Sequence, residues 1–387
     1  MRRSTKGAQR TLRARPAALA IAVTLVVALL GVGCGSDSDS GSASTSGGAP
    51  AAKDVRVAMV FGGPTDDGGW NLLFKQAGDA AVQAIPGTSV TYVANTFPGA
   101  QAQRAFRTLA QQGYDLVVGT AGGHDADLLK VVDDFPDTKF VAMLGRETRP
   151  NLATLDAALE QGRYLDGIVA GASSRSGKLG EIIGYPIPFL LRGVDGFTLG
   201  ARSVNPKATV ETLVINSWND PGRERQAAEA LVDDGADVLA MNTNTPAVPA
   251  VAEARRVGLI GYGTKRESPQ WLSAFTYDWG PFVEDQVEAI QDGSWKPVAY
   301  YGTLENGTIQ MLPFSPDLPD DVVAKVEEAR EQLADGTLAV FTGPLRSDEG
   351  KVVVPAGESL TEPEQLVACC DWLVEGASGA SVGGAGS

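Results

Sequence analysis

Aromatic, amide and carboxylate side chains recur at the ends of short β-rich runs in this chain, where they are suited to hold a planar ligand. Aromatic rings stack on flat heterocycles, and Asn and Asp offer the donors and acceptors that read their edges. Any single one is more often a core, cap or turn residue, but their joint placement on loops favours a small planar ligand. The candidate binding residues are Phe61, Asp67, Trp70, Asn71, Thr120, His124, Phe189, Trp218, Asn242, Asn244, Tyr262, Asp278 and Trp279.

Patterns for catalysis or metal binding are weak by comparison. His124 is the only histidine and no G-x-S-x-G segment accompanies it, so neither a serine hydrolase nor a histidine-rich zinc site is expected. Residues 171–179 suggest a phosphate-binding P-loop, but the spacing is one residue too long and Leu stands where Ser or Thr is required. Asp66 and Asp67 could form a carboxylate pair, or equally a turn that caps a helix. We expect no enzymatic activity, cofactor or metal.

Alternating strands and helices must position these loops. The predicted strands are 55–61, 89–93, 116–118, 139–143, 178–183, 209–215, 238–241 and 259–262, and the predicted helices are 70–84, 100–112, 126–134, 157–173, 190–204, 222–233 and 247–256. This alternation predicts parallel sheets covered by helices on both faces, and its restart after the helix at 157–173 predicts a second lobe. Ligands of such sheets bind outside the carboxyl ends of the strands.

The N-terminus is typical of an export signal. The first 33 residues hold six basic and no acidic side chains and end in an 18-residue apolar run. Such a run is also at the lower limit for a membrane-spanning helix, so an uncleaved anchor is the alternative. Residues 31–34 resemble a bacterial lipobox, in which Cys34 would carry the lipid, and the Ser/Gly-rich stretch up to residue 53 predicts a flexible tether.

Charge, length and cysteine content limit the kinds of partner, the number of domains and the state of the cysteines that we expect. With 47 acidic against 32 basic residues, the chain has a formal net charge of -15 and gains nothing from counterion release on nucleic acid, so no nucleic-acid partner is expected. A length of 387 residues exceeds one ordinary core and suggests two domains. Adjacent cysteines rarely form an unstrained disulfide, so Cys369 and Cys370 are expected to pack in a core unpaired.

Taken in order, these features resemble the basic membrane protein (BMP) family of substrate-binding lipoproteins of ABC transporters. The similarity runs from about residue 55 to 377 and rests on DDGGWN (66–71), GYDLVVGTAGG (113–123), FPDTKF (135–140), GRYLDGIVAG (162–171), GFTLGARSVNP (196–206), WNDPGRERQAAEALVDDGADVL (218–239), DWGPF (278–282), DGSWK (292–296), and TGPLRSDEGKVVVPAGE followed by DW (342–372). The resemblance implies a type I periplasmic-binding fold, which is α/β, with two Rossmann-like lobes of parallel sheets joined by a multi-crossover hinge.

The resemblance also implies domain boundaries. After the signal (1–33) and the lipidated Cys34 with its tether (34–53), the N-terminal lobe would comprise residues 54–157 and about 277–315. The C-terminal lobe would comprise residues 158–276 and about 316–376, and residues 377–387 would form a flexible tail.

Members of the family bind purine nucleosides or nucleobases, which implies roles for the candidate residues. Trp70 stands where the family places a stacking aromatic, with Asp67 and Asn71 beside it to read the edge of the ring. Phe61 would stack as well, and the polar shell would be completed from the other lobe and the hinge by Asn242, Asn244 and Asp278.

Two departures from the family pattern bear on the ligand. Nucleoside-binding members carry an acidic pair that grips the ribose after the strand ending here at Tyr262, whereas residues 261–265 read Gly-Tyr-Gly-Thr-Lys. With the additional Trp218 and Trp279, this favours the nucleobase branch, in which adenine is the expected ligand. His124 stands where relatives often have an aromatic residue, and it either replaces that ring or faces solvent.

The sequence therefore predicts a monomeric, lipid-anchored, extracytoplasmic receptor that captures a purine and delivers it to an ABC permease. A sensory or regulatory binding protein of the same fold is the first alternative. A nucleoside hydrolase would need a carboxylate cluster with a metal, or a catalytic His, which the sequence lacks. A receptor for another solute, such as a sugar or an amino acid, would share the fold, because the fold does not fix the ligand.

Overall fold

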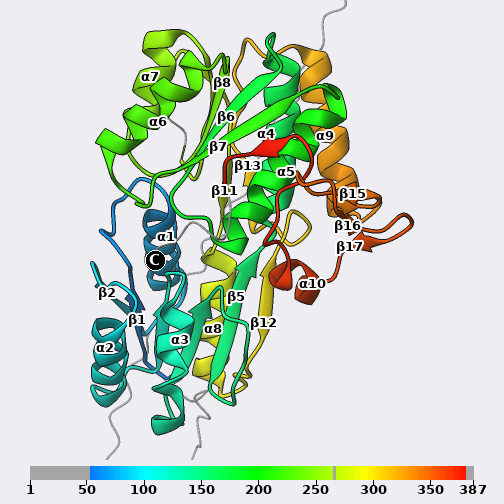
Figure 1. The fold of residues 1–387 in the computed structure, drawn as a ribbon. Helices are drawn as coiled ribbons and strands as arrows, with labels where there is room; N and C mark the ends of the chain where they lie inside the picture. Colours follow the sequence, from blue (N-terminus) through cyan, green and yellow to red (C-terminus); the bar gives the residue numbers. More distant parts are fainter. Residues whose placement is uncertain (1–52, 265–266, 381–387) are drawn as a thin grey trace, which may run out of the picture. The chain divides into compact units, whose positions relative to one another are not determined.

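The computed structural model describes residues 53–264 and 267–380, which all belong to one compact unit. The predicted signal, Cys34, nearly all of the predicted tether and most of the predicted tail lie outside the described residues. Two six-stranded sheets, each surrounded by helices, dominate the fold (Figure 1). No helix within residues 53–264 or 267–380 combines the length and the apolar character needed to cross a membrane.

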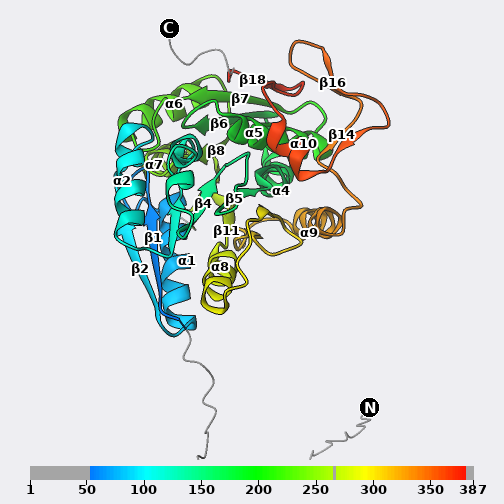
Figure 2. The same cartoon turned by 90° about the horizontal axis from the view of Figure 1, so that it is seen from below.

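The first sheet is entirely parallel, in the order β12-β5-β4-β3-β1-β2. Its strands are β1 (Val55–Val60), β2 (Thr88–Val93), β3 (Leu116–Gly119), β4 (Lys139–Met143), β5 (Leu152–Ala157) and β12 (Ala299–Gly302). Val57 and Met59 of β1 pack in one core with α1 (Trp70–Ala84) and α8 (Gly280–Asp292). Ala58 and Val60 pack on the opposite face with α2 (Ala100–Gln111) and α3 (His124–Leu128), as the period of two requires (Figure 2).

The second sheet is also parallel, in the order β10-β9-β8-β6-β7-β18. Its strands are β6 (Lys178–Ile183), β7 (Thr209–Val214), β8 (Val238–Asn242), β9 (Gly258–Ile260), β10 (Trp271–Ser273) and β18 (Ala377–Ser378). One face packs on α6 (Pro221–Asp233) and α7 (Ala247–Arg255). The other face packs on α4 (Leu159–Ser173), α5 (Pro188–Val204) and α9 (Asp320–Ala334).

Three segments carry the chain between the sheets. Helix α4 leads from β5 to β6, strand β11 (Phe275–Tyr277) leads from β10 to α8, and β13 (Ile309–Met311) leads from β12 to α9. Strands β11 and β13 pair antiparallel, so two of the three crossings lie side by side. Two parallel sheets joined in this way confirm the predicted α/β, type I periplasmic-binding fold.

Helices α4 and α5 pack backbone to backbone because glycines line their contact. A Cβ on Gly167 of α4 would collide with the carbonyl oxygen of Phe197, and a Cβ on Gly200 of α5 would collide with that of Tyr164. Only a residue without a side chain permits this approach. The crossing helix α4 is therefore in close main-chain contact with α5.

Short elements complete the C-terminal part. These are β14 (Phe341–Thr342), β15 (Leu345–Arg346), β16 (Val352–Val354), β17 (Ser359–Leu360) and α10 (Pro363–Ala368), with β14 paired to β17 and β15 to β16. Cys369 and Cys370, which follow α10, are joined by a disulfide. The expectation that these two cysteines pack unpaired is therefore wrong, although Cys370 is indeed buried.

Two predicted helices differ from the structure. The helix expected at 126–134 is α3, which begins earlier at His124, followed by a separate 3-10 helix, Val132–Asp134. The helix expected from residue 157 begins at Leu159, because the preceding residues form β5. All six residues of β5 are buried between β4 and β12, so this strand lacks the apolar–polar alternation that reveals a half-buried strand.

Candidate ligand-binding site

The loop between β1 and α1 places Trp70 at the first position of its helix. The carboxylate of Asp67 accepts hydrogen bonds from the main-chain N–H groups of Gly69, Asn71 and Leu72, at 3.0, 3.2 and 3.2 Å. These bonds satisfy donors that the first turn of a helix otherwise leaves free. The side-chain amide of Asn71 donates to the carbonyl oxygen of Pro64 at 2.9 Å. Asp67 and Asn71 therefore hold the loop that orients Trp70.

Trp70 lies at the centre of an aromatic cluster, which we define as Trp70, Phe74, Phe189, Tyr277 and Trp279. Its ring centroid is 5.5 to 6.0 Å from those of the other four, and each of the four contacts is edge-to-face. Trp279 also stacks flat between Phe74 and Tyr277, with centroids 5.0 and 4.8 Å away. These geometries are the favourable ones for aromatic pairs. The cluster joins α1 of the first lobe, α5 of the second and the crossing strand β11.

Residues at the carboxyl ends of β8 and β9 reach the same loop from the second sheet. The side-chain amide of Asn244 donates to Oδ2 of Asp67 at 3.0 Å, and Oγ1 of Thr264 donates to the carbonyl oxygen of Gly68 at 2.8 Å. Tyr262 is buried and its ring packs against Phe275 and Tyr277. The two lobes are therefore in direct contact beside Trp70.

Asn242 offers a side-chain amide at the carboxyl end of a strand in the second sheet. It is the last residue of β8, is 6 % exposed and makes no side-chain hydrogen bond to any described residue. A side-chain amide carries both donors and an acceptor, so it is suited to form hydrogen bonds with the edge of a ligand.

Trp218 lies apart from the aromatic cluster. It is 40 % exposed on the loop after β7, and its ring packs at 5.1 Å against Tyr185, which follows β6. A Cβ on Gly184 would collide with the Trp218 ring, so this indole covers the end of β6. Tyr185 was not predicted, although it stands in a loop where ligands of such sheets bind.

Phe61 and His124 are core residues in this arrangement. Phe61 is fully buried, and its ring packs against Tyr92 at 5.9 Å. His124 is also fully buried; its Nδ1 accepts from the N–H of Ala121 at 3.3 Å, and its Nε2 donates to the carbonyl oxygen of Thr96 at 2.9 Å. Burial lowers the pKa of His124. Both ring nitrogens therefore form hydrogen bonds with the main chain of the loops after β2 and β3. The ring does not face solvent, and neither nitrogen is free to bind a ligand.

Thr120 contributes through its backbone. Its carbonyl oxygen accepts a 2.7 Å hydrogen bond from the indole N–H of Trp70. Its own hydroxyl is buried and donates to the carbonyl oxygen of Val60 at 3.0 Å. Thr120 thus fixes the Trp70 ring without offering a side-chain group to a ligand.

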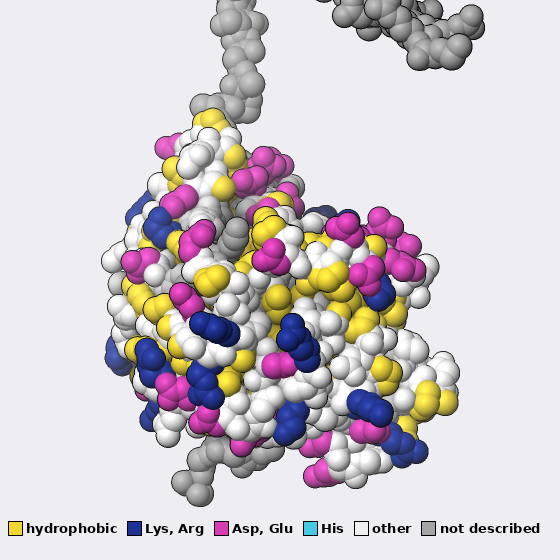
Figure 3. Space-filling view, turned by 90° about the horizontal axis from the view of Figure 1, so that it is seen from above, with side chains coloured by type: hydrophobic (Ala, Val, Ile, Leu, Met, Phe, Trp, Pro, Cys, Tyr) yellow, Lys and Arg dark blue, Asp and Glu magenta, His cyan; other side chains and the backbone are white. Residues whose placement is uncertain are grey.

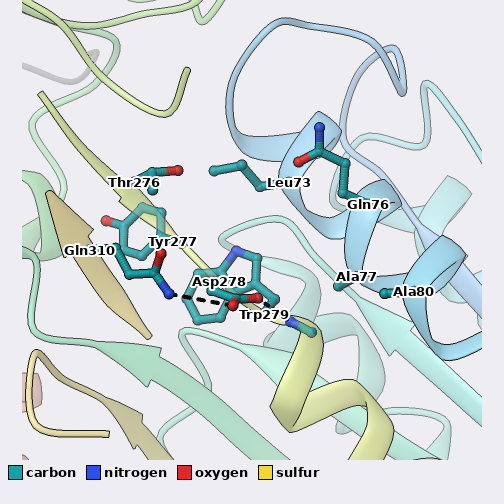
Figure 4. Close-up of a pocket in the computed structure, with 10 residues that line it drawn as sticks. Leu73, Gln76, Ala77, Ala80, Thr276, Tyr277, Asp278, Trp279 and Gln310 are labelled. Carbon is teal, nitrogen blue, oxygen red and sulfur yellow. Dashed lines mark hydrogen bonds between the residues drawn. The ribbon is translucent and has the colours of Figure 1, made fainter. Parts of the chain in front are cut away.

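A hollow of about 310 Å³ lies beside the aromatic cluster, between α1 and the crossing strand (Figure 4). Its walls are Leu73, Gln76, Ala77, Ala80, Thr276, Tyr277, Asp278, Trp279, Gly280 and Gln310. The Asp278 carboxylate accepts from the N–H of Gly280 at 3.0 Å and from the amide of Gln310 at 3.4 Å. Asp278 and Trp279 are thus brought together here, but not with Trp218, Asn242 or Asn244.

Two buried polar atoms at the edge of this hollow have no hydrogen-bond partner within the described part of the chain. They are the hydroxyl of Tyr277 and the indole N–H of Trp279. Unpaired buried donors are rare in native structures. Phe74 of the aromatic cluster was not predicted, although the spacing of four residues between Trp70 and Phe74 places both on one face of α1.

Buried ion pairs support the cluster from the side of α4 and α5. Arg192 pairs with Asp156 at 3.0 Å and with Glu160 at 2.9 Å, and its guanidinium lies over the ring of Phe189. Arg163 pairs with Glu181 and lies 3.8 Å from Asp166. Burial raises the pKa of Asp166 to about 7. These ion pairs therefore connect the crossing helix α4 to α5 and to β6, and they connect α5 to β5.

The face of the molecule drawn in Figure 3 is neither uniformly positive nor uniformly negative. Basic and acidic side chains are interspersed there among apolar ones. Within residues 53–264 and 267–380, no three His, Cys, Asp or Glu side chains are grouped so that they could hold a metal ion. The aromatic cluster itself offers rings for stacking, and the Tyr277 hydroxyl and Trp279 indole N–H for hydrogen bonding.

Residues 54–290 match the Bmp family profile, described as ABC transporter substrate-binding protein PnrA-like. The chain belongs to the Bmp family. Membership implies a small-molecule ligand, a permease partner and a place of work outside the cytoplasm. The family is one of substrate-binding proteins rather than of enzymes.

Two curated proteins illustrate the range of ligands named for Bmp-family relatives. A purine-binding protein of Brucella abortus is 34 % identical over 324 residues, which span 83 % of this chain and 92 % of the relative. A Haloferax volcanii protein, named for glucose binding by an ABC transporter, is 30 % identical over 300 residues, 77 % of this chain and 76 % of that relative.

Solved structures agree with the Bmp-family fold. An ABC transporter solute-binding protein from Conexibacter woesei is 28 % identical with a TM-score of 0.62, covering 73 % of this chain and 97 % of its own. A solute-binding protein from Aeropyrum pernix K1 is 18 % identical with a TM-score of 0.64, covering 76 % and 93 % of the two chains, and supports the fold alone.

Proposed function

We propose that this chain is a receptor that captures a purine, most readily adenine, outside the cytoplasmic membrane and delivers it to an ABC permease. The observation that carries the proposal is the aromatic cluster, in which Trp70 meets rings from both lobes and from the crossing strand. The purine-binding name of the Brucella relative supports the same ligand class.

In this proposal Trp70 supplies the stacking surface for the purine, with Phe189 approaching from α5. Asn242 supplies donors and acceptors to the edge of the base, because its buried amide makes no bond within the described chain. Asp67 and Asn71 act by holding the loop of Trp70 rather than by touching the ligand. Binding sums contacts from two lobes, so closure of the lobes and capture of the base are coupled.

The proposal also covers the membrane anchor, the boundaries of the lobes and the oligomeric state. Cys34 would carry the lipid that keeps the receptor at the outer face of the membrane, with the residues up to 53 as its tether. The lobes would comprise residues 54–157 with about 277–315, and 158–276 with about 316–376. The receptor would act as a monomer without catalytic activity.

Isothermal titration tests the ligand assignment. The full chain in detergent, unfolded and refolded once to remove carried-over ligand, is titrated with adenine, guanine, adenosine, guanosine and glucose. Saturable adenine binding, tighter than that of any sugar, is the expected result. Absence of binding to all four purine compounds would overturn the assignment while leaving the fold in place.

Glucose is the second candidate, because the Haloferax relative is named for it. Sugar sites also use aromatic rings as platforms, so the cluster alone does not separate the two ligands. Glucose binding without purine binding in the same titration would reassign the receptor to sugars.

A further inference from the structure

We propose that contacts between residues 67–69 of the first lobe and Asn244 and residues 262–264 of the second form a clasp that keeps a sugar out of the binding site. The site would then admit a free base and reject its nucleoside. This inference rests on the proposed function, since it narrows the ligand class of the same site.

Among the described residues, two hydrogen bonds hold the clasp together. The Nδ2 of Asn244 donates to Oδ2 of Asp67 at 3.0 Å, and Oγ1 of Thr264 donates to the carbonyl oxygen of Gly68 at 2.8 Å. The partners are 177 and 196 positions apart along the chain, so both bonds join the loop after β1 to loops after β8 and β9. Both form only when the lobes are together.

Glycines let the two main chains touch between these bonds. Gly263 has a φ of 73°, and a Cβ on it would lie 3.1 Å from Cα of Gly69. A Cβ on Gly69 would collide with Oδ1 of Asn244 and lie 3.2 Å from Cε1 of Tyr262. A space too small for a methyl group cannot admit a ribose ring, so a sugar at this point would have to part the lobes.

The clasp lies next to Trp70 in the chain, at the residues that immediately precede it. Phe74, Phe189, Tyr277 and Trp279 surround its ring from α1, α5 and the crossing strand. Gly69, the residue before Trp70, lies against Asn244 and Tyr262 of the second lobe. A ligand larger than a base, held on Trp70, would therefore extend toward the clasp. Accommodating it would break the two hydrogen bonds and separate the glycine contact, whereas a base leaves them intact.

The test compares the preference for adenine over adenosine in the wild-type full chain and in two variants. Thr264→Val removes the hydroxyl donor at nearly constant shape, and Gly69→Ala inserts a methyl group into the contact. Thr342→Val is the matched control, because its hydroxyl also donates to a carbonyl oxygen, that of Ala339 at 2.9 Å, within the C-terminal part. Thermal unfolding of each protein establishes that it is folded.

The wild type should prefer adenine, and Thr264→Val should reduce the ratio of adenosine to adenine dissociation constants by about fivefold, the factor expected for one hydrogen bond. Gly69→Ala should reduce it further, and Thr342→Val should leave it unchanged. If the wild type binds both ligands equally, or if both variants keep the wild-type ratio, the clasp is overturned and the receptor assignment stands. If the wild type binds neither adenine nor adenosine, the clasp proposal falls, and the receptor assignment falls with it if guanine and guanosine also fail to bind.

Discussion

The indole N–H of Trp70 donates a 2.7 Å hydrogen bond to the carbonyl oxygen of Thr120, which ties the start of α1 to the loop after β3. Together with four edge-to-face ring contacts, this bond fixes the Trp70 ring in one orientation. A side chain that is already ordered loses little conformational freedom when a ligand binds. Trp70 is therefore preorganised as a stacking surface.

Trp70→Ala should lower purine affinity by about 1–3 kcal/mol, the range measured for stacking of a base on an aromatic side chain. Titration of the variant with adenine measures this loss. Trp295→Ala is the control, since that indole also donates a hydrogen bond, to Gln286 at 2.8 Å, but lies outside the aromatic cluster. An unchanged adenine dissociation constant in Trp70→Ala would remove Trp70 from the site.

The order of elements could be predicted because each leaves a local signal. Helix α1 spans Trp70–Ala84 as predicted, since its apolar residues recur with helical period after a loop rich in Asp and Gly. Strand β5 could not be predicted, because its burial on both faces depends on partners remote in sequence. Strands β3 and β8 are also fully buried but form continuous apolar runs that were predicted, whereas Thr154 and Asp156 interrupt the apolar residues of β5.

The candidate site was less predictable than the fold. The sequence places Phe61 and His124 at strand ends, but only the fold turns both side chains into the core. It likewise gives no sign that Asp67 would bond to the first turn of α1 and to Asn244 at the same time. Which way a loop side chain points depends on long-range packing, and residue types alone do not report it.

Arg192→Met should destabilise the protein by about 3–5 kcal/mol, because it leaves the buried carboxylates of Asp156 and Glu160 without their cation. Urea unfolding monitored by fluorescence measures the loss. Arg330→Met, which removes an exposed pair with Glu327, should change stability by less than about 1 kcal/mol. Equal effects of the two substitutions would contradict a structural role for the buried pairs.

Stability should fall as the pH drops below about 6.5, in part because of His124. Burial lowers the pKa of His124 in the folded state, so below 6.5 the unfolded chain binds a proton that the native protein does not. The stabilisation is complete above the unfolded pKa and is lost as the pH falls. His124→Gln should show a shallower dependence between about pH 7 and 5 in urea unfolding. Parallel curves for the two proteins would rule out this contribution.

Asp166 should give a dependence of the opposite sign. Burial raises its pKa to about 7, although Arg163 and the hydroxyl of Ser273 favour the charged form. Between the ordinary value of 3.8 and about 7 the native protein holds a proton that the unfolded chain releases, so stability falls as the pH rises through this window. Asp166→Asn mimics the protonated carboxyl and removes this dependence. Its unfolding free energy should therefore rise relative to wild type from pH 4 to about 7 and the difference should then stay constant, whereas a difference independent of pH would show that Asp166 is ionised throughout.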